Sequence, residues 1–110
     1  MTIEIQPVND DAGVLGMPNG FWPAFCVETP VAKIIDCHYK HADRSVIVYE
    51  HDGYVGEWFS EAEALEMHRL LVEYVKTEGF MNHRYFSERK SQMNSMLEFL
   101  PQCGGFRMNH

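Results

Sequence analysis

The sequence predicts an α+β domain, in which an antiparallel β-meander of three to five strands is followed by two C-terminal helices packed on one face. Segments rich in β-branched and aromatic residues fill the chain up to residue 59. Helical periodicity begins only after Ser60, where Glu63 completes a capping-box pattern. The 110 residues, 45% of them hydrophobic and 23% charged, fit a single domain over 1–110.

The first third of the chain is expected to add short strands to the sheet. Residues 1–11 alternate only until Pro7, which favours an edge strand or a loose arm. The Met-Pro-Asn-Gly sequence at 17–20 is typical of a turn and predicts a hairpin that pairs residues 14–15 with residues 21–28.

The meander itself is expected in the middle of the chain. Residues 31–40 alternate and predict a strand, followed by a polar turn. Asp52-Gly53 is typical of a two-residue type I′ hairpin loop, so residues 45–51 should pair with residues 54–59.

Two helices are expected after the meander. The first should cover residues 60–78 and end at Gly79, acting as a left-handed C-cap. The second should start at residue 82 or 87 and end before Pro101, and the tail 104–110 should be flexible. The expected apolar stripe of the first helix is Leu65, His68, Leu71, Val72 and Val75. That of the second helix is Phe86, Met93, Met96, Leu97 and Leu100.

The charge is strongly acidic and unevenly distributed. The net charge is −7, and residues 50–78 hold eight acids against two bases, a local balance of −6. Direct binding to nucleic acid or to anionic membranes needs basic surface, so neither is expected, whereas a basic protein is a fitting partner. Residues 1–11 carry no positive charge and no long apolar stretch, so a signal peptide is not expected. No apolar run reaches the roughly 20 residues that span a bilayer, and together these features predict a cytoplasmic location.

Metal and thiol chemistry are weakly indicated. Cys26, Cys37 and Cys103 are too widely spaced for a zinc motif and are expected to be free thiols. Cys37 and His38 would point to opposite faces of a strand and could not share an ion. The remaining metal candidates are His38, His41 and His51, and no cofactor is expected.

One face of the meander is a candidate protein-binding site. If His51 pairs with Tyr54, then Tyr49, Tyr54 and Trp58 share the face turned away from the helices. Exposed aromatic residues beside charges are typical of interface centres. The alternatives are that the N-terminal segment covers this face or that a homodimer buries it. The acidic residues expected to complete the site are Glu57, Glu61, Glu63 and Glu66.

These observations predict a non-catalytic acidic interaction protein. It would act as an inhibitor or adaptor on a basic surface of a nucleic-acid-handling complex, by analogy with the small acidic proteins that viruses make against host defences. One alternative is a small metal- or histidine-dependent enzyme, with His68 near Glu57 as a tuned base. Another is a homodimeric ligand-binding module.

Overall fold

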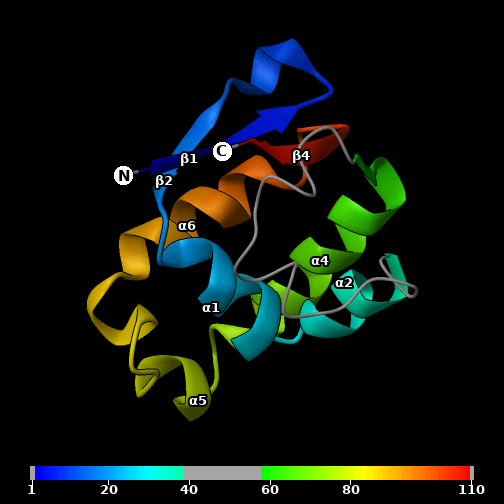
Figure 1. The fold of residues 1–110 in the computed structure, drawn as a ribbon. Coiled ribbons are helices and arrows are strands. Elements are labelled where there is room, and N and C mark those ends of the chain that lie inside the picture. The colour runs from blue at the N-terminus through cyan, green and yellow to red at the C-terminus, as the bar shows by residue number, and fades with distance from the viewer. Residues whose placement is uncertain (1, 39–57, 110) are drawn as a thin grey trace.

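A computed structural model describes residues 2–38 and 58–109 and shows an α+β fold (Figure 1). Its four-stranded antiparallel sheet has the order β2-β1-β4-β3. The strands are β1 (Thr2–Pro7), β2 (Leu15–Pro18), β3 (Phe59–Ser60) and β4 (Gly105–Asn109). The predicted class is confirmed, but the predicted order is not, because helices precede β3 and a strand follows the last helix.

The two central strands come from opposite ends of the sequence. β1 pairs with β4, with Ile5 opposite Met108 and Pro7 opposite Phe106. Ile5, Met108 and Phe106 are buried, so each strand contributes alternate side chains to the core. The predicted loose or edge arm and the predicted flexible tail are therefore both wrong. Of the segments 45–51 and 54–59 predicted to form the meander, only Trp58 and Phe59 lie within the described residues, and Phe59 belongs to β3.

The segment predicted as a strand over 21–28 is helical, and so is most of the described part of the segment predicted as a strand over 31–40. They form α1 (Phe21–Glu28) and α2 (Ala32–His38). α1 is apolar almost all round, and such a run has no period that separates strand from buried helix. Its proline is the third residue, in the first turn, where no helical N–H is lost. Thr29 joins the two helices, because its hydroxyl donates to Phe25 O at 2.7 Å and accepts the Val31 N–H at 3.3 Å.

The predicted start of the next helix, α4 (Glu61–Tyr74), is confirmed. Ser60 Oγ accepts the Glu63 N–H at 3.1 Å, and the Ser60 N–H donates to Glu63 Oε1 at 2.8 Å. The helix is rotated from the predicted stripe, because Leu65 is 46% exposed. The buried positions are Ala64, Met67 and Leu71.

The predicted end of this helix is wrong. α4 stops at Tyr74, and Gly79 lies inside the short helix α5 (Glu78–Met81) without a positive φ. Thr77 starts α5, since its hydroxyl accepts the Phe80 N–H at 3.3 Å. Phe80 packs edge-on against Tyr74, with ring centroids 5.6 Å apart, which ties α5 to the end of α4.

The last helix is shorter than predicted but buries the predicted stripe. Residues 86–88 form a 3₁₀ turn, η3 (Phe86–Glu88), before α6 (Lys90–Phe99). The predicted core residues are buried, with Leu97 partly so. In Figure 1 the helices lie below the sheet, on its buried face, and a 3₁₀ turn, η1 (Asp10–Ala12), closes the β1–β2 hairpin above it. No helix in the described ranges has the length and hydrophobicity to span a bilayer.

Candidate functional site

The structure tests only part of the predicted aromatic site. Trp58 is 43% exposed, and the Arg107 guanidinium lies 4.9 Å from the centre of its ring. Arg107 is held in place because its Nε donates to Gln6 Oε1 at 2.9 Å. The predicted residues that lie outside the described ranges, or whose side chains do, are Tyr49, Tyr54, Glu57, His38, His41 and His51.

The three predicted acids on α4 have different roles. Glu63 belongs to the capping box, so its carboxylate holds the start of the helix. The Glu66 carboxylate accepts hydrogen bonds from two nitrogens of the Arg69 guanidinium, and these bonds lower the pKa of Glu66. Glu61 is exposed and makes no ion pair or side-chain hydrogen bond with another described residue. His68, predicted to lie on the apolar stripe, is partly buried.

Three distant segments meet at the turn between α6 and β4. The Val8 N–H donates to Gly105 O at 2.9 Å, and Asn9 Nδ2 donates to Gln102 O at 3.0 Å. On the other side of the turn, the Cβ position of Gly105 would lie 2.6 Å from Phe59 O and 3.3 Å from the Glu61 nitrogen. The turn therefore joins the β1–β2 hairpin to the beginning of α4.

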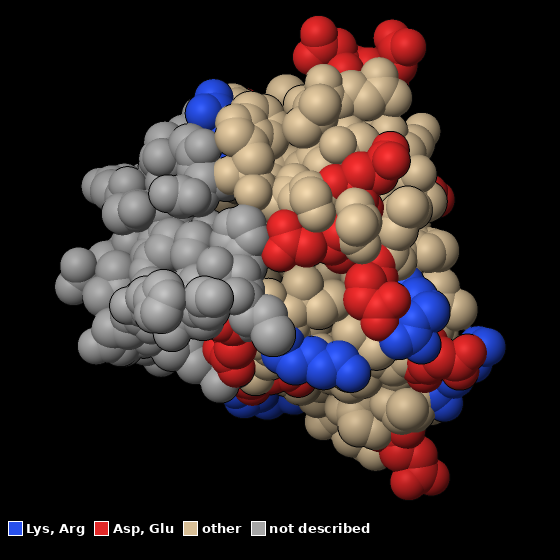
Figure 2. Space-filling model, turned by 90° about the vertical axis from the view of Figure 1, so that its right-hand side faces the viewer, with Lys and Arg blue, Asp and Glu red and all other residues tan. Residues whose placement is uncertain are grey.

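The surface around this turn is acidic. Residues 7–15, 58–66 and 98–106 hold six acids and neither lysine nor arginine. We call four of them the acidic end: Asp10, Asp11, Glu61 and Glu98. In the described part of the chain, none of these four carboxylates makes an ion pair or a side-chain hydrogen bond. Figure 2 shows the side of the molecule that lies on the right in Figure 1. On it, acidic side chains (red) extend to the top of the view, whereas most basic side chains (blue) lie in the lower half.

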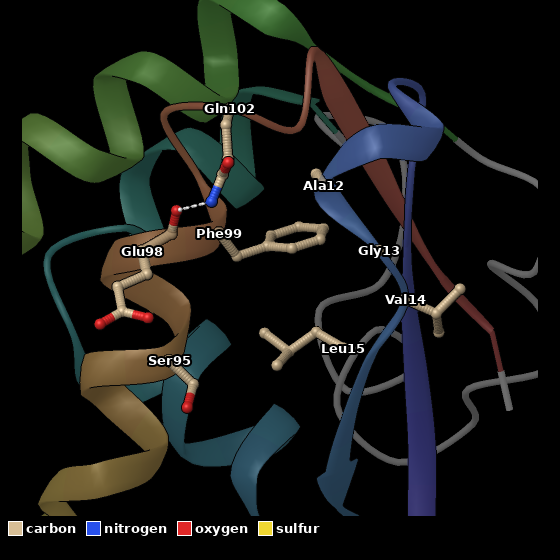
Figure 3. Close-up of a pocket in the computed structure, with 8 residues that line it drawn as sticks. All are labelled: Ala12, Gly13, Val14, Leu15, Ser95, Glu98, Phe99 and Gln102. Atoms are coloured by element: carbon tan, nitrogen blue, oxygen red, sulfur yellow. Dashed lines mark hydrogen bonds between the residues drawn. The ribbon is translucent and has the colours of Figure 1, made fainter.

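A hollow of about 180 Å³ opens beside the acidic end, between the β1–β2 hairpin and α6. Figure 3 shows the Leu15 side chain and the Phe99 ring reaching toward one another across it, while Val14 points away. Gln102 Nε2 donates to the backbone oxygen of Glu98 at 2.8 Å, which fixes the amide at the rim. The residues that line the hollow are Ala12, Gly13, Val14, Leu15, Ser95, Glu98, Phe99 and Gln102.

A second titratable cluster, the paired end, consists of Glu28, His83 and Arg84. His83 Nδ1 accepts the backbone N–H groups of Tyr85 at 3.0 Å and Phe86 at 3.3 Å, so the ring proton is on Nε2. Nε2 lies 3.1 Å from Glu28 Oε1, although its N–H is not aimed along a regular hydrogen bond. Arg84 Nε donates to the same carboxylate oxygen at 3.1 Å. Both histidine nitrogens face the protein, so this pair is poorly placed for acid–base catalysis on a substrate.

Thiol and metal chemistry find little support in the described residues. Cys26 and Cys103 are buried, and neither forms a disulfide with another described residue. Burial raises the pKa of Cys103, which disfavours the reactive thiolate. Across residues 2–38 and 58–109, no three histidine, cysteine or acidic side chains converge as metal ligands would.

Comparison with known proteins gives no relative. No protein-family model matches the chain. Neither the curated proteins nor the solved structures contain a match. The acidic end and the hollow beside it are therefore the features of the described residues that bear on function.

Proposed function

We propose that the protein is a non-catalytic interaction protein that binds a basic protein surface through its acidic end. The observation that carries this proposal is the set of four carboxylates around one turn that have no partner among the described residues, in segments that hold no lysine or arginine. Uncompensated surface charge of one sign accelerates association with a surface of opposite charge and sets its orientation.

The proposed partner is a protein or complex that handles nucleic acid, and the protein acts on it as an inhibitor or adaptor of the anti-defence type. Complexes of that kind expose lysine and arginine to bind phosphates. An acidic end competes with nucleic acid for such a surface, because both offer negative charge to the same groups. The net charge of −7 supports this competition at long range.

The test is a charge reversal of the acidic end with a matched control. The variant carries Asp10→Lys, Asp11→Lys and Glu61→Lys, which avoid the capping residue Glu63 and the paired Glu66. Partners captured by the wild-type protein from a native lysate are purified, and their Kd values are measured by titration at several salt concentrations. We expect the reversal to weaken binding by about 10- to 1,000-fold and to flatten its salt dependence.

The control reverses three acids elsewhere, Glu73→Lys, Glu78→Lys and Glu88→Lys, and changes the net charge equally. It should weaken binding by only a few fold, since it alters the long-range field but not the docking surface. Double-stranded DNA added to the wild-type complex should displace the partner. Equal losses in the two variants, or unchanged binding after reversal of the acidic end, would contradict the proposal.

A further inference from the structure

We propose that the hollow beside the acidic end receives one arginine side chain of the basic partner. This inference rests on the proposed function and names the group that the site recognises. The arginine would pass its alkyl part between Leu15 and Phe99 and bring its guanidinium to the carboxylate of Glu98. Size, lining and hydrogen-bonding capacity each favour this occupant.

The volume fits one side chain. Pockets for cofactors and drug-sized molecules enclose roughly 300–1,000 Å³, and a cavity of about 150 Å³ holds a benzene-sized group. At about 180 Å³, this hollow is too small for a nucleotide but large enough for a single long side chain. Its walls at Leu15 and Phe99 are apolar, so they suit the methylene groups of that side chain.

The polar groups at the rim offer acceptors, and three of their donors are already engaged within the fold. The Ser95 hydroxyl donates to Ser91 O at 3.0 Å, and the Gln102 amide donates to Glu98 O at 2.8 Å. The Gly13 N–H donates to Asp10 O at 3.1 Å. The oxygens of Ser95, Gln102 and Glu98 are left to accept, so the matching ligand is rich in donors.

Arginine meets these requirements better than lysine does. A guanidinium has five N–H donors in a plane and no acceptor, and it loses hydration more readily than an ammonium group. It can bind a carboxylate and a neighbouring amide oxygen at the same time. An anionic ligand is disfavoured because Glu98 lines the hollow, and Asp10 and Asp11 precede the lining residue Ala12 in the 3₁₀ turn η1.

The test is a titration of the ¹⁵N-labelled protein with N-acetyl-arginine N-methylamide, followed by amide chemical shifts. We expect saturable shifts at Gly13, Leu15 and Gln102, with a Kd in the millimolar range. The citrulline analogue has nearly the same shape without the charge and should bind at least about fivefold more weakly. The lysine analogue should fall between the two.

Glu98→Gln should weaken arginine binding by about fivefold and leave the remaining spectrum unchanged, because Glu98 is exposed. Glu88→Gln, an equal change in the 3₁₀ turn η3, should have no effect. Shifts located elsewhere, equal binding of citrulline, or an unchanged Kd for Glu98→Gln would overturn the inference. Those results would not affect partner capture through Asp10, Asp11 and Glu61, so the two proposals fail separately.

Discussion

The carboxylates of the acidic end and of the paired end differ in their exposure and in their charged neighbours. Glu28 is about 30% exposed and has His83 and Arg84 against it. Asp10 and Asp11 sit on an exposed 3₁₀ turn and have no partner of opposite charge in the described ranges. A partly buried charge must be compensated within the fold, whereas an exposed one remains hydrated at little cost. The comparison separates acids that hold the structure together from acids that are available to another molecule.

The largest expected change in the free energy of unfolding comes from an uncharged substitution in the turn that the acidic end surrounds. Gly105 has φ +109°, and a Cβ there would lie 2.6 Å from Phe59 O. Gly105→Ala should therefore separate β3 from β4 and lower the free energy of unfolding by about 3 kcal/mol or more. Urea denaturation measures the loss.

The matched control for this substitution is Gly16→Ala in β2. Gly16 has no positive φ, and nothing lies within 4 Å of its Cβ position. The change should stay within about 0.5 kcal/mol of the wild-type stability. Similar losses for the two variants would show that the sheet in general, not the crossing at Gly105, limits stability.

A smaller effect compares the two ends directly. Glu28→Gln should cost about 1 kcal/mol, because a neutral amide binds the Arg84 guanidinium more weakly than a carboxylate does. Glu98→Gln should change stability by less than about 0.5 kcal/mol, since that carboxylate has no intramolecular partner in the described chain. Thermal unfolding at pH 7 distinguishes the two values. A larger loss for Glu98→Gln would invalidate the distinction between the ends.

The smallest effect is a fall in stability at alkaline pH. Burial raises the pKa of Cys103 above its ordinary value of 9.0, and burial together with the Glu28 charge raises the pKa of Tyr74 above 10.0. Above about pH 9 the unfolded chain loses these protons before the folded chain does, so the free energy of unfolding falls as pH rises.

Two substitutions separate the contributions of Cys103 and Tyr74 to this alkaline loss of stability. Cys103→Ala should reduce the part that begins near pH 9, and Tyr74→Phe should reduce the part that begins near pH 10, to which Tyr85 also contributes because burial raises its pKa. Urea denaturation between pH 7 and pH 11 gives the slopes. An unchanged slope in both variants would show that other groups cause the alkaline loss.

Local signals predicted the parts of the fold that depend on neighbours in sequence. The capping box at Ser60 and the apolar stripe around Met93 and Met96 are such signals, and both are confirmed. β4 could not be predicted in this way, because its partner β1 lies about a hundred residues away. α1 was misread because an apolar run suits a buried helix as well as a strand.

The candidate site was predicted only in part, for the same reason. Glu61 was expected at an acidic surface, and the structure leaves it exposed. The start of α4 and the β1–β2 hairpin, which carries Asp10 and Asp11, meet through the turn at 101–105, a contact between segments that only tertiary structure brings together. The hollow depends on the same contact and on β2, whose hairpin partner was predicted to be residues 21–28 instead of β1.

The antiparallel pairing of β1 with β4 determines where a label or surface anchor can be attached away from the acidic end. Pro7 and Gly105 lie at the ends of β1 and β4 that are nearest the acidic end. Thr2 and Asn109 therefore lie at the opposite ends of these two strands. A surface anchor or fluorescent label joined through Thr2 or Asn109 would orient the carboxylates outward. Either attachment point would therefore suit sensors or affinity columns built on this molecule.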